Sequence, residues 1–124
     1  MGYACRAGTT TAYNTGKALT EEQAAFDGTG NIGTTTVGKY AANAFGLHDM
    51  HGNIYEWCED YYGPYSKAPK DGSAQTIKQE SVRRMLRGGC WYLGSRDCRS
   101  AYRSSFSLDV RYFYTGFRVV AVLP

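Results

Sequence analysis

Several features that would point to common classes of protein are missing from this sequence. No apolar run approaches the roughly 20 residues of a membrane-spanning helix, and the first residues carry no signal-peptide pattern. Only two histidines occur, and no two cysteines have the CxxC spacing of a zinc or dithiol redox site. The chain has no internal repeat and no low-complexity tract. At 124 residues we expect one domain over residues 1–124 with no membrane span.

The four cysteines leave two alternatives open. An even number permits disulfides between Cys5, Cys58, Cys90 and Cys98. Buried free thiols are favoured, because free cysteine is among the most buried residue types. The cysteine count therefore fixes no cellular compartment.

Proline is scarce at 3, whereas glycine at 15 and tyrosine at 11 are abundant, which favours a loop-rich domain with aromatic packing. Helical signals are few. Residues 3–7 look like a helix tail ended by Gly8, and residues 21–26 like a helical turn with Thr20 and Gln23 in capping-box spacing. The composition thus predicts little helix.

The strand signals are short and widely separated. A glycine–asparagine turn leads into an aromatic strand over residues 52–58, and residues 82–86 and 116–123 resemble core strands. Residues 9–11 favour an extended segment, and the polar stretch 61–80 is the best candidate for a long surface loop. Such a domain must fix its loops by buried hydrogen-bond donors or a bound ion.

Lysine is absent from residues 87–120, where six arginines face only Asp97 and Asp109. Arginine without lysine indicates planar, bidentate hydrogen bonding within a structure. The net charge of the whole chain, +3, is too small to imply a nucleic-acid partner. We therefore interpret residues 87–120 as the functional segment.

The stretch from Gly46 to Trp57 offers hard oxygen ligands. Asp49 and Glu56 flank a turn that can aim backbone carbonyls inward, as calcium sites require. The alternative is that Asp49 caps a turn and Glu56 pairs with an arginine. His48 and His51 are three residues apart but lack a third ligand for a transition metal.

Six motifs spread over the chain carry a family resemblance. They lie at residues 3–9, 43–47, 52–58, 87–91, 98–101 and 116–118. The sequence resembles the formylglycine-generating-enzyme/sulfatase-modifying-factor family, in a version that looks shortened at its N-terminus. The resemblance implies a C-type-lectin-like α+β fold, loop-rich, with short antiparallel strands and few helices. It also implies structural calcium held by the Asp49 and Glu56 side chains and the Gly52 and Ile54 carbonyls.

The family's oxidases hold copper with two cysteines five residues apart. In this sequence the second falls on Cys98 and the first on Leu93. An alkyl chain cannot complete the two-sulfur site that Cu(I) needs, so no copper is expected. The alternative function is a formylglycine-generating-type oxidase, or a catalytically degenerate relative, acting on sulfatase cysteines.

The 87–120 segment resembles the variable proteins of diversity-generating retroelements, which place a hypervariable stretch on this fold. Adenine-directed mutagenesis of AAY codons cannot yield Lys, Glu, Gln, Met or Trp. Twelve positions between the frame residues obey this restriction and are the predicted display positions: Tyr92, Leu93, Gly94, Asp97, Ser104, Ser105, Phe106, Ser107, Val110, Tyr112, Phe113 and Tyr114.

Tyr and Phe give large contact area, and Ser and Gly give adaptable contacts, as in antibody loops. We expect a protein or cell-surface ligand and no nucleic acid, because the arginine spacing fits the family scaffold. Arg99, Arg103, Arg111 and Arg118 are expected to lock irregular backbone through their donors. The alternative for residues 112–114 is a strand that alternately buries and exposes its aromatic rings.

Overall fold

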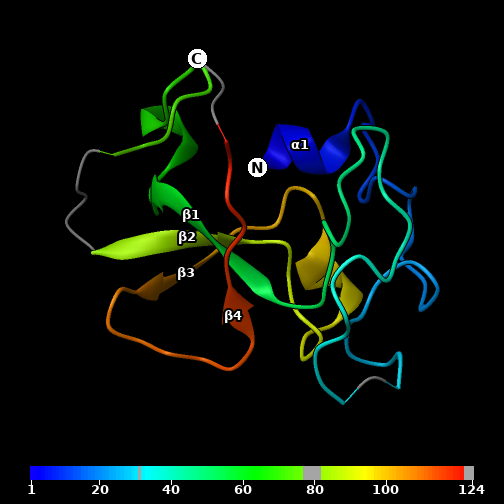
Figure 1. Ribbon diagram of the computed structural model, residues 1–124. Helices are drawn as coiled ribbons and strands as arrows, with labels where there is room; N and C mark the ends of the chain where they lie inside the picture. Colours follow the sequence, from blue (N-terminus) through cyan, green and yellow to red (C-terminus); the bar gives the residue numbers. More distant parts are fainter. Residues whose placement is uncertain (31, 77–81, 122–124) are drawn as a thin grey trace.

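The computed structural model describes residues 1–30, 32–76 and 82–121, and in these ranges regular structure is sparse (Figure 1). A short helix α1 (Gly2–Arg6) comes first, as predicted, and ends where Ala7 and Gly8 take positive φ. The turn at residues 21–23 has the predicted capping bond, since the Thr20 N–H donates to Gln23 Oε1, but it does not continue as a helix. No helix within the described ranges is long and apolar enough to cross a membrane.

One four-stranded sheet organises the C-terminal half of the chain. Its strands are β1 (Tyr55–Tyr61), β2 (Arg83–Arg87), β3 (Ser104–Ser107) and β4 (Thr115–Gly116). The order is β3-β2-β1-β4, with β4 parallel to β1 and the other pairs antiparallel. The aromatic strand after the glycine–asparagine turn and the strand near residues 82–86 are therefore confirmed.

Long loops connect the strands. The 3-10 helix η1 (Tyr65–Lys67) follows β1, and η2 (Ser95–Cys98) lies between β2 and β3. The predicted loop at residues 61–80 is observed as far as residue 76, and residues 77–81 lie outside the described ranges. Residues 9–11 form no strand; nearby there is only a single bridge between Tyr13 and Gly16.

The predicted core strand over residues 116–123 is wrong in its described part. Pairing stops at Gly116, and Phe117, Val119 and Val120 are 75%, 84% and 83% exposed. Arg118 turns instead toward Glu56 of β1. Residues 122–124 lie outside the described ranges.

Two small clusters of buried side chains form the core. One joins Tyr13, Leu19 and Ala24 to Cys98. The other, which we call the sheet cluster, consists of Tyr55, Leu86 and Cys90. Half-buried side chains from residues 57, 93, 102, 106 and 114 pack against it. One face of the sheet is thus covered by the segment that carries the predicted display positions.

All four cysteines are free thiols. Cys5, Cys90 and Cys98 are buried and Cys58 is half-buried. The favoured alternative of buried free thiols is confirmed for the first three.

Candidate ligand-binding surface

Five of the predicted display residues meet in one group of rings, which we call the aromatic face: Tyr92, Phe106, Tyr112, Phe113 and Tyr114. Tyr114 lies at its centre, stacked on Tyr112 at 5.0 Å and 7° and on Tyr92 at 6.1 Å and 13°. Phe113 meets Tyr114 edge-on at 5.1 Å, and Phe106 meets Tyr112 at 4.8 Å. Offset-stacked and edge-on pairs are the favoured ring geometries, so the residues support one another.

The aromatic face has an exposed layer and a supporting layer. Phe113, Tyr92 and Tyr112 are 74%, 59% and 41% exposed. Phe106 and Tyr114 are half-buried and pack on the sheet cluster. The exposed layer is therefore accessible to a ligand, and the supporting layer packs against the core.

Residues 109–114 form no strand, so the strand alternative for this segment is wrong. Alternation would give Tyr112 and Tyr114 equal exposure, opposite to that of Phe113. Instead Phe113 and Tyr112 are both exposed, and Tyr114 is half-buried.

The other predicted display positions are dispersed. Leu93 packs against the sheet cluster, Gly94 is exposed, and Asp97 and Val110 are half-buried. On β3, Ser104 and Phe106 share one side of the sheet because side chains alternate along a strand.

That alternation separates the two remaining serines from the aromatic face. Ser105 pairs with Met85 and Ser107 with Arg83, on the opposite side of the sheet from Phe106. The twelve predicted positions therefore do not form one continuous surface, and the aromatic face is the part that the structure brings together.

Arginines fix the loops around this surface mainly through main-chain carbonyls, as predicted. Arg87 Nη1 donates to the Tyr102 carbonyl at 2.8 Å, and Arg103 Nη2 donates to that of Gly63 at 2.6 Å. Arg99 Nε reaches the carbonyl of Arg96 at 2.7 Å. These acceptors are main-chain atoms, so the bonds do not depend on the side chains of the residues that supply them.

The strongest polar contact joins Glu56 and Arg118. Nε of Arg118 donates to Oε2 at 2.6 Å and Nη2 donates to Oε1 at 2.5 Å, while Nη1 reaches the His48 carbonyl at 3.1 Å. Nη2 also reaches the Asp49 carbonyl at 3.2 Å. Glu56 is 7% exposed, and its carboxylate raises the pKa of Arg118. The guanidinium thus binds both oxygens of the Glu56 carboxylate and two main-chain carbonyls.

This geometry bears on the predicted calcium ligands Asp49, Gly52, Ile54 and Glu56. Both Glu56 oxygens already accept hydrogen bonds from Arg118, which is the alternative that the sequence left open. Asp49 Oδ2 accepts the Gly38 N–H at 2.6 Å, whereas Oδ1 is buried with no partner within the described ranges. A cage that includes Glu56 does not fit these residues, because Arg118 supplies the positive charge there.

We accordingly expect EDTA to leave the melting temperature of the purified chain unchanged within about 1 °C. A dialysed sample with calcium added back is the control. A clear fall on chelation that calcium reverses would contradict this expectation and support a structural ion.

Of the residues aligned with the copper cysteines, Cys98 is enclosed and Leu93 is half-buried. Cys98 is fully buried, and a Cβ added at Gly89 would lie 2.5 Å from its sulfur. Burial raises the pKa of the Cys98 thiol to about 12. Leu93 packs on the sheet cluster and offers no ligand atom. The structure therefore presents no accessible thiol pair at this place.

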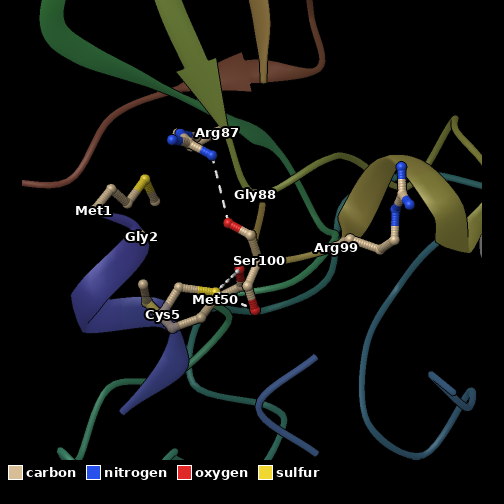
Figure 2. A pocket seen from close by; sticks show the side chains of 8 residues that line it. All are labelled: Met1, Gly2, Cys5, Met50, Arg87, Gly88, Arg99 and Ser100. Carbon is tan, nitrogen blue, oxygen red and sulfur yellow. Dashed lines mark hydrogen bonds between the residues drawn. The ribbon is translucent and has the colours of Figure 1, made fainter. Parts of the chain in front are cut away.

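A small pocket lies beside α1, with room for about one water molecule (Figure 2). In it Cys5 Sγ lies 3.4 Å from Ser100 Oγ and 3.8 Å from His51 Nε2. His51 cannot serve as its base, since Nδ1 is 2.7 Å from the Cys98 carbonyl and Nε2 accepts the Asn14 N–H at 3.1 Å. We interpret the cluster of Cys5, Ser100 and His51 as structural.

Sequence reasoning missed some aromatic partners of the surface. Trp91 contacts Tyr92 at 5.6 Å and Phe113 at 6.0 Å, and Trp57 contacts Phe106 at 6.3 Å. The position of Trp91, two residues after the Gly88–Gly89 pair, marks it as a frame residue. Its ring contacts depend on loop geometry and have no sequence signal.

The chain matches a family model described as the sulfatase-modifying factor enzyme 1-like domain over residues 1–123. The chain belongs to this family. It is 42% identical to serine/threonine-protein kinase pkn1 of Chlamydia caviae, over 73% of this chain and 15% of that protein. It is 33% identical to the formylglycine-generating enzyme of Mycobacterium tuberculosis, over 74% of this chain and 34% of that protein.

Two solved structures share the fold. Treponema denticola variable protein 1 has a TM-score of 0.81 and 27% identity, with 94% of this chain and 42% of that chain covered. PvdO from Pseudomonas aeruginosa has a TM-score of 0.84 and 31% identity, with 94% and 47% covered. The predicted family and C-type-lectin-like α+β fold are thus confirmed. This chain spans less than half of each of these relatives.

Proposed function

We propose that this chain is a ligand-binding domain that displays interchangeable side chains on a C-type-lectin-like scaffold, as diversity-generating retroelement variable proteins do. The observation that carries the proposal is the aromatic face, in which Tyr92, Tyr112 and Phe113 are exposed. Main-chain hydrogen bonds hold the loops that carry them: the Trp91 N–H donates to the Asn53 carbonyl and the Tyr55 N–H to the Tyr114 carbonyl, both at 2.9 Å. Exposed aromatic residues clustered on a monomer are typical of binding surfaces. Likeness to a variable protein supports the same interpretation.

The genetic test concerns the origin of the display positions. We expect the gene to lie near a reverse transcriptase and an invariant template repeat of the segment around residues 92–114. Differences between template and gene should fall at adenines in the codons of the display positions. A genome without any such template would sink the retroelement part of the proposal.

The binding test uses the exposed layer. Tyr112→Ser together with Phe113→Ser should weaken binding of a ligand selected on this protein by roughly a hundredfold, since a few aromatic anchors carry most of an interface's energy. Isothermal titration calorimetry measures the effect. The matched control, Tyr3→Ser, removes an exposed ring that lies against Phe45 in the N-terminal half and should leave binding unchanged.

The second candidate function is oxidation of a sulfatase cysteine. Family membership and the mycobacterial relative favour it, whereas Leu93 and the enclosed Cys98 do not. We expect no copper-dependent oxygen uptake with a cysteine-containing sulfatase peptide. Turnover above the copper-only background, lost in Cys98→Ser, would overturn the binding proposal in favour of catalysis.

A further inference from the structure

We propose that the aromatic face binds a protein surface rich in carboxylates. This inference rests on the proposed ligand-binding function and specifies the chemistry of the partner. Both the charges that surround the face and the arrangement of its rings support this partner.

Two cations lie beside the aromatic face without an acidic partner. Arg111 is exposed next to Tyr112, and its Nη1 donates only to the carbonyls of Leu108 and Val110, at 3.3 and 3.2 Å. Arg84 is the cross-strand partner of Phe106 and therefore shares its side of the sheet. Within the described ranges the recorded ion pair is Arg118–Glu56, so the charges of Arg84 and Arg111 are not neutralised by side chains there.

Arg84 is also held in place. Its guanidinium lies 3.8 Å from the centre of the Tyr61 ring and donates to the Glu59 carbonyl. A stacked guanidinium keeps unused donors in a fixed plane, which suits bidentate pairing with a carboxylate. Since its position is already fixed, less entropy is lost on binding.

The positive charge is concentrated in the part of the chain that builds this surface. Residues 83–118 contain eight arginines and two aspartates, whereas residues 1–82 contain six Lys and Arg against nine Asp and Glu. Complementary charge steers partners and excludes those of like charge. Two arginines without neutralised charge beside exposed aromatic rings therefore fit a partner that has carboxylates next to an apolar centre.

The ring arrangement favours a protein over a single-stranded nucleic acid. Nucleic-acid platforms need open ring faces on which bases stack. Here Tyr114 stacks on both Tyr92 and Tyr112, so one face of each of these two rings is closed to a base. Arg84 and Arg111 are the cations placed beside these rings, and two are few for contacts along a phosphate backbone.

The test pans a random-peptide phage library on the immobilised 124-residue chain, with counter-selection on the Tyr112→Ser, Phe113→Ser variant. We expect Asp and Glu to be enriched about threefold over the naive library, as complementarity to the two arginines requires. A synthetic peptide from the selection should lose roughly tenfold in affinity on Arg111→Glu. Lys17→Glu makes the same charge change at an exposed residue of an N-terminal loop and should have little effect.

Each other outcome overturns a stated part of the account. Selected peptides that need Tyr112 and Phe113 but lack acidic enrichment overturn the carboxylate proposal and leave the binding function standing. Failure to select any peptide that depends on these rings overturns both. Oligo(dT) that binds as tightly as the selected peptide and is lost on Arg111→Glu overturns the choice of a protein partner.

Discussion

Replacing Arg118 with Met is expected to lower the free energy of unfolding by about 3 kcal/mol, because it leaves the buried Glu56 carboxylate without its partner. The change also removes two bonds that hold the main chain at His48 and Asp49. For a domain of this size the melting temperature should fall by roughly 10 °C. Urea unfolding followed by circular dichroism measures both quantities.

Arg111→Met is the matched control, since it also removes an arginine of the C-terminal segment. Its guanidinium reaches only carbonyls of its own turn, and we expect a change within about 0.5 kcal/mol. Adding Glu56→Gln to Arg118→Met should recover about 1 kcal/mol, because a neutral amide costs less to bury than an unpaired carboxylate. Equal stability of Arg118→Met and wild type would show that the ion pair does not hold this turn.

Gly52→Ala is expected to cost more than about 4 kcal/mol and to leave little folded protein. Gly52 has a φ of +71°, and a Cβ added there would lie 2.0 Å from the Ala25 carbonyl oxygen. The Gly52 N–H also donates to the Gly88 carbonyl at 2.7 Å, so the main chain cannot shift without losing this bond. Yield of soluble protein and thermal unfolding are the measurements.

The variant Gly46→Ala distinguishes backbone strain at a positive φ from a steric clash of the added Cβ. Gly46 has nearly the same φ, +76°, but open space where the Cβ would stand. We expect it to cost only about 1 kcal/mol, the ordinary cost of a left-handed alanine. If both variants lost the same stability, the close approach to Ala25 would not be what requires glycine at position 52.

Much of the scaffold around the display positions could be predicted from the sequence. The residue patterns that indicate it are local, or lie in the order of the family motifs along the chain. The helix end at Gly8 and the strand after the glycine–asparagine turn follow from residue type. Arginines without lysines predicted hydrogen bonding within the structure, and the carbonyl contacts of Arg87 and Arg103 confirm it. These features need no knowledge of distant contacts.

Two structural features could not be predicted because they depend on which segment of the chain packs or pairs beside another. The apolar residues after Gly116 have strand character, yet their pairing with β1 ends at Gly116, and Arg118 turns toward Glu56. Periodicity indicates an amphipathic segment but does not say what lies beside it. The display positions were also predicted as one segment. Side chains alternate along β3, however, so Ser105 lies on the opposite side of the sheet from Phe106.

The central claim is that the aromatic face is a displayed surface on a frame that does not depend on it. The most direct test is thermal unfolding of a variant in which Tyr92, Tyr112 and Phe113 are all changed to Ser. Because these side chains are 59%, 41% and 74% exposed, we predict a loss of no more than about 2 kcal/mol and a cooperative transition. A loss large enough to unfold the chain, comparable to that of Gly52→Ala, would show that these rings belong to the core and would contradict the account.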